Sequence, residues 1–165
     1  NSGSAMELDE RTLGMIKEVV KEKNIHTLWF EAHFMYRKQL AKFAEQYDGV
    51  EVKFRCGVES FDGQLREQWK KGVAANVTVA DVAKHFQGVC LLCCTKGDTK
   101  ERILRDIALA EQYFEYASVN VFCENSTSVK RDNDLAKWFV EEVYPTLKQS
   151  KKIEILINNT DLGVG

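Results

Sequence analysis

The sequence predicts an α/β fold with a parallel sheet. Short apolar runs alternate with amphipathic stretches along the whole 165-residue chain, and the centres of five such runs lie about 25 to 38 residues apart, the length of a strand–helix unit. One run, residues 89–94, is almost continuously apolar, which is typical of a strand covered on both faces. Consecutive right-handed units give either an open, doubly wound sheet or part of a (β/α) barrel, and periodicity alone leaves both open.

Five strands are expected. The first, HTLWFEA, follows the charged turn KEKN, and the second runs into the segment FRCGVES. Turn or helix signals follow each of the later runs. The expected strands are residues 26–32, 50–56, 89–94, 117–123 and 152–157.

Amphipathic helices are expected around these strands. Asp9 can cap the first, because Leu13, Ile16 and Val20 recur at spacings of three and four. The last helix is expected to break at Pro145, since the residue before a proline avoids the helical conformation. The later helices are expected at residues 36–47, 62–70, 77–86 and 132–148, and in a long segment that begins after the capping residue Thr99.

Composition and charge exclude several functional classes. With 44% hydrophobic residues the chain is long enough for one domain with a sizeable core. Basic and acidic residues number 23 and 25 and are interspersed, which gives no electrostatic reason to expect a nucleic-acid partner. No apolar run approaches the ~20 residues of a membrane span, and no signal-peptide pattern begins the sequence. Five irregularly spaced cysteines indicate reduced thiols and a cytoplasmic location.

The cysteines do not predict a metal site. On a strand, Cys90 and Cys94 would face one side of the sheet and Cys93 the other, so the three thiolates cannot converge on one ion. Buried, apolar cysteines are the expected reading. The sequence also contains no GxGxxG, no Walker loop, no GxSxG and no zinc-ligand spacing.

Polar residues follow two of the predicted strands. Glu59 lies two residues after Gly57 at a strand end, and Asp98 and Thr99 follow the third strand. The carboxyl ends of parallel strands are where α/β proteins place ligand sites. Helix capping is the alternative role for these residues. Glu31 with His33 is either a ligand-binding or proton-exchanging pair, or a hydrogen-bonded pair at the sheet edge.

Six segments together resemble the elongator-like branch of the radical S-adenosylmethionine (radical SAM) superfamily. The opening NSGS is similar to the segment that contacts the methionine amino group of the cofactor, FEAHFMYR to a strand end of ESRP type, and FRCGVESFD to the G-[IV]-E-S strand. CCTKGDT is similar to a GLPGET turn, SVNVFCENSTSVKRD to the following strand and loop, and NNTDLGVG to the tail of this group. Each segment is short, and their shared order and spacing carry the identification.

The resemblance implies a fold and a set of binding residues. The fold is a single domain over residues 1–165, an incomplete (β/α) barrel with about five to six parallel strands and helices on one outer face. S-adenosylmethionine is the implied cofactor, bound at the carboxyl-terminal rim of the sheet. The implied cofactor-binding residues are Ser2, Gly3, Ser4, Glu31, Gly57, Glu59 and Ser60. The implied substrate-side residues are His33, Arg37, Gly97, Asp98, Asn120 and Asn125. No residue is assigned a catalytic or metal-ligating role.

The chain departs from the family at the iron–sulfur cluster. In the family a CxxxCxxC loop holds a [4Fe–4S] cluster, whose reduction cleaves S-adenosylmethionine to a 5′-deoxyadenosyl radical. No CxxxCxxC occurs in this sequence. We therefore expect the carboxyl-terminal portion of a radical SAM enzyme, which contributes cofactor and substrate surface, holds no cofactor by itself and is inactive alone.

Two alternatives stay open. Residues 1–5 are either the NSGS segment or the remnant of a cloning tag. The chain itself is either this portion of an enzyme or a non-catalytic α/β module that binds another metabolite or a protein. A barrel that lacks its first strand exposes a strand edge, so either self-association or a loop that covers the edge is also expected.

Overall fold

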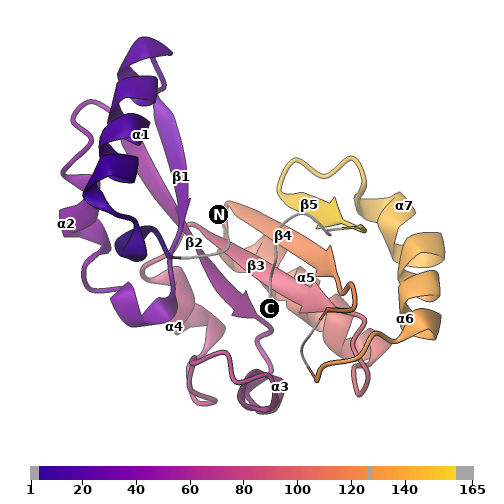
Figure 1. Ribbon diagram of the computed structural model, residues 1–165. Coiled ribbons are helices and arrows are strands. Elements are labelled where there is room, and N and C mark those ends of the chain that lie inside the picture. The colour runs from indigo at the N-terminus through magenta and orange to yellow at the C-terminus, as the bar shows by residue number, and fades with distance from the viewer. Residues whose placement is uncertain (1–3, 126–127, 159–165) are drawn as a thin grey trace.

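The computed structural model describes residues 4–125 and 128–158. Within them, five strands form one sheet in the order β1-β2-β3-β4-β5, and every neighbouring pair is parallel, as predicted. Each strand lies within two residues of its predicted position at its start, and the second extends further at its end. The strands in Figure 1 are β1 (Thr27–Glu31), β2 (Glu51–Glu59), β3 (Gly88–Cys93), β4 (Tyr116–Val121) and β5 (Ile153–Leu156).

Helices precede the sheet and connect its strands. Asp9 caps the first α-helix by accepting a hydrogen bond from the amide of Thr12 at 2.7 Å, and Thr99 caps the longest one by accepting from the amide of Arg102, both as predicted. The α-helices are α1 (Glu10–Glu22), α2 (Leu40–Ala44), α3 (Gly63–Gln68), α4 (Val79–Ala83), α5 (Lys100–Tyr113), α6 (Asn133–Trp138) and α7 (Tyr144–Leu147). The short 3₁₀ turns are η1 (Ala5–Glu7) and η2 (Phe34–Tyr36), and η3 (Phe139–Val143) is a π-helical turn.

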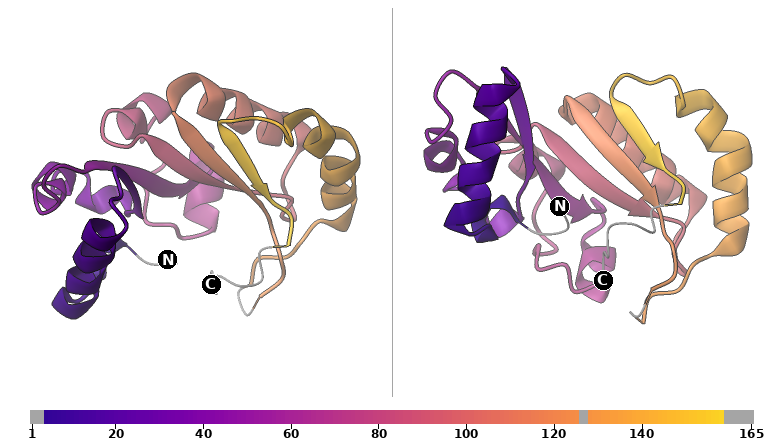
Figure 2. Two further views of the ribbon diagram at one scale, coloured as in Figure 1. Left: turned by 90° about the horizontal axis from the view of Figure 1, so that it is seen from above. Right: turned by 45° about the horizontal axis from the view of Figure 1, so that its top comes forward.

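The sheet is strongly curled into a half-barrel. Strands that follow one another in sequence are also neighbours in the sheet, so right-handed crossovers carry the connecting helices to the same side. Seen from above in Figure 2, the curved sheet has α5, α6 and α7 on its convex outer side. The fold is therefore a partial (β/α) barrel, which confirms the predicted class.

The hydrophobic core fills the space between the outer face of the sheet and the helices. Phe30 of β1 and Phe54 of β2 are 8% and 4% exposed and pack with Phe43 of α2, which contacts Phe30 edge to face at a centroid distance of 5.2 Å. On β3, Val89 and Leu91 are likewise buried outward. Burying each such side chain contributes about 1.5–3 kcal/mol, so this layer fixes which residues of every strand face inward.

The predicted helix at residues 36–47 is wrong in its extent. The segment contains the 3₁₀ turn η2 and then the five-residue helix α2. The side chain of His33 accepts a hydrogen bond from the amide of Met35 at 3.2 Å and so caps the 3₁₀ turn, whereas Gln39 offers α2 no side-chain cap. Local side-chain capping therefore divides a stretch whose apolar spacing indicates one helix.

The predicted break at Pro145 is confirmed, and it takes the form of the π-turn η3. Proline has no amide hydrogen, and its ring crowds the carbonyl of the residue four positions earlier, here Glu141. The wider π-turn between α6 and α7 relieves both effects. Among residues 4–125 and 128–158, no helix has the length and apolarity that crossing a membrane requires.

Candidate functional site

The inner, concave face of the half-barrel carries mostly polar and charged side chains. Side chains alternate along each strand, and the outward set is fixed by the core, so the remaining positions face inward. On β2 these are the positions next to the buried Phe54, Cys56 and Val58. The inward residues of the five strands are Thr27, Trp29, Glu31, Glu51, Lys53, Arg55, Gly57, Glu59, Gly88, Cys90, Leu92, Tyr116, Ser118, Asn120, Glu154 and Leu156.

Two carboxylates flank a glycine at the carboxyl-terminal end of β2. A Cβ atom placed on Gly57 would lie 3.4 Å from Oε1 of Glu31 and 3.8 Å from Oε1 of Glu59. The glycine therefore leaves a small space that both carboxylates border. The structure brings together three residues of the predicted cofactor set here, on neighbouring strands and on the inner side of the sheet.

Each carboxylate has a basic partner. Nε of Arg55 lies 3.5 Å from Oε2 of Glu31, and Nζ of Lys71 lies 3.3 Å from Oε1 of Glu59. Burial raises the pKa of both acids, and it outweighs the opposing effects of Arg55 on Glu31 and of Lys71 on Glu59. Both acids are therefore partly desolvated carboxylates that a hydrogen-bond donor or a cation would stabilise.

The backbone around Glu59 is unusual. Glu59 has a φ of +64°, in the left-handed region that non-glycine residues seldom occupy. The ladder between β2 and β3 also shifts register between Cys56 and Glu59. This bulge turns the strand end and aims the Glu59 side chain back over Gly57. Glu59 caps no helix, because the first turn of α3 is capped by Asp62.

His33 does not pair with Glu31. Its Nδ1 accepts from Met35, and its Nε2 lies 2.9 Å from the carbonyl oxygen of Lys71, so the ring proton resides on Nε2. Gly72 packs against the same ring, where a Cβ would lie 3.2 Å from Nε2. The expected ligand-binding or edge pair is thus replaced by a link between η2 and the loop that carries Lys71.

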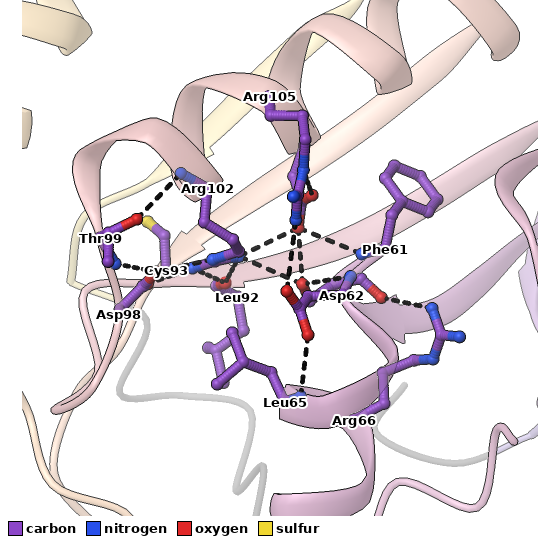
Figure 3. Close-up of polar contacts among 12 residues, drawn as sticks. Phe61, Asp62, Leu65, Arg66, Leu92, Cys93, Asp98, Thr99, Arg102 and Arg105 are labelled. Atoms are coloured by element: carbon purple, nitrogen blue, oxygen red, sulfur yellow. Dashed lines mark hydrogen bonds and ion pairs between the residues drawn. The ribbon is translucent and has the colours of Figure 1, made fainter. Parts of the chain in front are cut away.

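Figure 3 shows polar contacts of a second cluster, at the ends of β2 and β3. Its central side chains, those of Ser60, Asp98, Arg102 and Asp106, are 0–6% exposed, so we call it the sealed cluster. The guanidinium of Arg102 donates to Asp98 through Nε at 2.6 Å, to Asp106 at 3.0 Å and to the carbonyl of Leu92 at 3.3 Å. Asp98 also accepts from the amide of Cys94 at 3.0 Å, and its side chain has 0% exposure. Asp98 of the predicted substrate side is therefore engaged in internal bonds.

Ser60 belongs to the same sealed cluster. Its hydroxyl donates to Asp106 at 2.6 Å and accepts from the amide of Asp62 at 3.0 Å, and the residue has 0% exposure. Together with Arg102 and Asp98 it joins the end of β2 to the end of β3 through α5. Ser60 directly follows Glu59 in the chain, so this network fixes the backbone from which Glu59 projects.

Arg66 organises the loop that follows α3. It is 1% exposed, and its guanidinium donates to the carbonyls of Ser60, Ala74, Ala75 and Val77 at 2.8–3.1 Å. Bonds of a charged donor to carbonyls in a buried setting are among the stronger hydrogen bonds. This residue therefore holds the loop of Lys71 against the rim.

The other predicted site residues are spread along the rim. The Ser4 hydroxyl accepts from the amides of Met6 and His33, each at 3.4 Å. Arg37 stacks on Phe34 at 4.6 Å from the ring centroid. Gly97 has a φ of +89° in the turn after β3, and Asn120 faces inward and donates to the carbonyl of Leu91. Asn125 is exposed after β4. Ser2 and Gly3 lie outside the described residues.

The cysteines do not fit an iron–sulfur cluster. Burial raises the pKa of Cys56, of Cys93 and of Cys90, the last to about 12, whereas cluster ligands are thiolates. Within the described ranges, no three Cys, His, Asp or Glu side chains are grouped to hold a metal ion. The predicted orientation of Cys94 is wrong: β3 ends at Cys93, Cys94 has a φ of +66°, and their Sγ atoms lie 3.6 Å apart.

Three residues of the inner face were not predicted from the sequence as site residues. The apolar run around Trp29 predicts a core position for it, which is wrong, because Trp29 is 37% exposed. Arg55 and Trp29 carried a detectable signal, because each lies two residues before a predicted site residue on the same strand face. Lys71 carried none. It reaches Glu59 from a loop twelve positions further along, and only the fold of that loop brings the two charges together.

Comparison with known proteins supports the fold. A scan against protein-family models found none that matches, and a search of curated proteins found no match. Among solved structures, a queuine lyase from Clostridium spiroforme bound to SAM and queuine is similar with a TM-score of 0.89 and 35% sequence identity. The similarity covers 100% of this chain and 71% of that one. With the curled parallel sheet and the predicted motif order, this shows that the chain belongs to the radical S-adenosylmethionine superfamily.

Proposed function

We propose that this chain forms the cofactor- and substrate-binding face of a radical SAM enzyme. The observation that carries the proposal is the space at Gly57, which the carboxylates of Glu31 and Glu59 border on the inner face of the sheet. A glycine at this point lets a ligand approach the backbone closely. The neighbour's binding of SAM supports the same reading.

The chemistry of the pair suits S-adenosylmethionine. The cofactor carries an ammonium group, a sulfonium cation and ribose hydroxyls, and carboxylates are acceptors for the donors among them. Partial burial makes such charge-assisted hydrogen bonds stronger than they are in water. In this proposal Glu31, Gly57 and Glu59 contact the cofactor. The ammonium of Lys71 stabilises the ionised form of Glu59. Ser60 and Asp98 hold the backbone of the rim in position. The remaining residues of the predicted set stay predictions.

The substrate is proposed to bind beside the cofactor on the same inner face. The neighbour is bound to queuine as well as to SAM, and its 35% identity over this whole chain makes a related small molecule the first candidate. Asn120 and Ser118 of β4 face the same side as the two carboxylates. A non-catalytic module that binds another metabolite is the second candidate.

This chain on its own is proposed to hold no [4Fe–4S] cluster and to leave S-adenosylmethionine uncleaved. Support comes from the missing CxxxCxxC pattern and from buried thiols held in the protonated form. Anaerobic reconstitution with iron and sulfide should therefore give less than stoichiometric cluster, and no 5′-deoxyadenosine on reduction. A stoichiometric cluster with 5′-deoxyadenosine production would overturn this part of the proposal.

Equilibrium binding tests the cofactor assignment. We expect S-adenosylmethionine to bind the chain, and Glu59→Gln to weaken binding about tenfold, because a neutral amide loses the charge-assisted acceptor. Glu67→Gln is the matched control, since Glu67 is an exposed acid on α3. Equal binding by the wild type and both variants, with retained circular dichroism, would remove Glu59 from the cofactor site.

Self-association and location also stay predictions. Within the described residues β1 pairs only with β2, and beside it a cavity of about 230 Å³ is lined by apolar side chains of α1 and β1, including Met15, Val19 and Leu28. Open edges of this kind invite pairing with another chain. A concentration-independent monomer in sedimentation would contradict self-association. The free cysteines support the proposed cytoplasmic location.

A further inference from the structure

One tryptophan of the inner face is accessible to solvent. Trp29 on β1 is 37% exposed, whereas Trp69 and Trp138 are 9% and 8% exposed. It lies two residues before Glu31 and faces the same side of the sheet. A large aromatic side chain that stays exposed on a concave, charged face is typical of a ligand-binding surface.

The indole of Trp29 lies across the floor of the half-barrel. A Cβ on Gly88 would lie 3.0 Å from Cζ3 of Trp29 and 3.0 Å from the carbonyl oxygen of Tyr116, so the glycine makes room for the ring above β3. The ring centroid of Tyr116 is 5.7 Å from that of Trp29, with the planes inclined by 50°. An aromatic floor thus extends from β1 to β4, at the level of the first residues of β3 and β4 and below the rim.

The indole is held in place from one side. Nζ of Lys53 lies 5.8 Å from its ring centroid, and the same ammonium is fixed by Glu115 at 2.6 Å and by Glu51 at 3.2 Å. A cation over the ring face is favourable by about 0.5–1 kcal/mol at exposed sites. These contacts therefore favour one position of the ring before any ligand binds.

A donor and an acceptor border this floor. The Cβ of Arg55 would be 3.3 Å from a Cβ on Gly88, so Arg55 and Trp29 meet above the same glycine. Arg55 in turn contacts Glu31, and the two side chains are 27% and 25% exposed. A guanidinium donor beside a carboxylate acceptor is complementary to the edge of a guanine-type base, which offers a carbonyl acceptor beside ring and exocyclic N–H donors.

We propose that Trp29, Tyr116, Arg55 and Glu31 form the subsite for a guanine-type heterocycle of the substrate. The base stacks on Trp29, and its polar edge faces Arg55 and the Oε2 of Glu31 that lies beside it, whereas Oε1 of Glu31 borders the cofactor space at Gly57. This inference deepens the proposed function and rests on it, since it places the substrate class beside the cofactor carboxylates. Stacking on an aromatic side chain supplies most of the affinity, and the ion pair supplies the preference among bases.

Tryptophan fluorescence tests the subsite with 7-deazaguanine as the probe. We expect saturable quenching of the wild type, with and without S-adenosylmethionine. Trp29→Phe should abolish the quenching while calorimetry still detects binding, and Trp29→Ala should weaken binding at least tenfold. Trp138→Phe, which replaces a buried tryptophan, should leave the quenching unchanged. Adenine, which lacks the carbonyl and the neighbouring N–H donor, should bind more weakly than 7-deazaguanine.

A second variant keeps the proposal testable if Trp29→Ala unfolds. Arg55→Met retains the length of the side chain but not the donor, and it should weaken 7-deazaguanine binding at least fivefold with little effect on adenine. No binding by the wild type would overturn the proposal. Quenching that persists in Trp29→Phe, or equal binding by wild type and Arg55→Met, would also overturn it.

Measuring cofactor binding on the same variants distinguishes a failure of the base subsite from a failure of the proposed function. S-adenosylmethionine binding is measured on the same variants, and Trp29→Phe should change it by less than twofold. Cofactor binding without base binding would remove the subsite and leave the proposed function. Base binding that depends on Trp29, without cofactor binding, would keep the subsite and remove the cofactor assignment.

Discussion

Two polar clusters meet at the carboxyl-terminal rim of this half-barrel, and they differ in burial and in how closely their charged groups are paired. The sealed cluster of Asp98, Arg102, Asp106 and Ser60 is almost fully buried, and Arg102 alone bonds to two carboxylates and a backbone carbonyl. In the open cluster of Glu31, Arg55, Glu59 and Lys71, the ion pairs are 3.3–3.5 Å long and the side chains are 12–27% exposed.

This difference shows how acidic and basic side chains at neighbouring strand ends can have either a structural or a ligand-binding role. In the sealed cluster the charges are matched mainly by hydrogen bonds among its own members. Oδ1 of Asp106 has no hydrogen-bond partner, but it is buried and lies 3.6 Å from Nε of Arg105, which leaves little room for a ligand. In the open cluster burial raises the pKa of both acids, because their basic partners compensate the lost hydration incompletely. The first arrangement stabilises the rim, and the second leaves acceptors for a ligand.

The largest expected effect comes from breaking the sealed cluster. Arg102→Ala leaves two buried carboxylates without their cation, so we expect the free energy of unfolding to fall by about 3–5 kcal/mol. Denaturant titration measures this. Lys137→Ala is the control, because the Lys137 side chain is 72% exposed, pairs only with the exposed Glu141 among the ion pairs of the described residues, and should cost less than about 1 kcal/mol. Equal losses in the two variants would contradict the assignment of the sealed cluster.

Two glycines near the rim should respond differently to an added methyl group. A Cβ on Gly63 would lie 2.4 Å from the carbonyl oxygen of Ala75, so Gly63→Ala requires a backbone shift and should cost about 1–3 kcal/mol. A Cβ on Gly57 meets only the two carboxylates at ordinary contact distance, so Gly57→Ala should change stability by less than about 1 kcal/mol.

The same pair separates stability from binding. Gly57→Ala fills the space between Glu31 and Glu59, so it should weaken S-adenosylmethionine binding although the protein remains folded. Thermal unfolding and equilibrium dialysis on the two variants provide the measurements. If Gly57→Ala leaves the affinity for S-adenosylmethionine unchanged, the cofactor does not bind at the space between Glu31 and Glu59.

A smaller effect is expected on the pH dependence of stability. The pKa of Glu59 is raised in the folded state, so folding favours its protonated form and stability is lost as pH rises from its unfolded pKa through the folded one. Glu59→Gln removes this loss. The variant should therefore be more stable than the wild type at pH 7, by about 1.4 kcal/mol for each pKa unit of elevation, and equal to it near pH 3. Denaturant titration of both proteins at both pH values measures the difference in the free energy of unfolding. If the variant is less stable than the wild type at pH 7, the ion pair with Lys71 contributes more to stability than the burial of Glu59 costs.

Much of the fold was predictable from the sequence. The five strands and the caps Asp9 and Thr99 follow from periodicity and capping chemistry, which are local. The barrel curvature required the resemblance, because open and curved parallel sheets share the same alternation. The prediction of one helix at residues 36–47 was wrong, because the His33 side chain accepts a hydrogen bond from the amide of Met35 and a 3₁₀ turn forms there instead.

The candidate site was predictable only in part. Glu31, Gly57 and Glu59 are brought together because parallel strands end at one rim. The sequence did not separate these residues from Ser60 and Asp98, which occupy equivalent strand-end positions. Their difference arises from Arg102 and Asp106 of α5, which reach the sheet from another element and bind the latter two.

Site-resolved NMR with S-adenosylmethionine tests the central claim most directly. In an ¹⁵N-labelled sample, added cofactor should shift the backbone amides of Glu31, Gly57 and Glu59 and of Lys71 in a saturable manner. The amides of Arg102 and Asp106 in α5 should change much less, because the sealed cluster is buried and its charges pair with one another. Saturable shifts centred on α5, or no shifts at the Gly57 end of β2, would contradict the account.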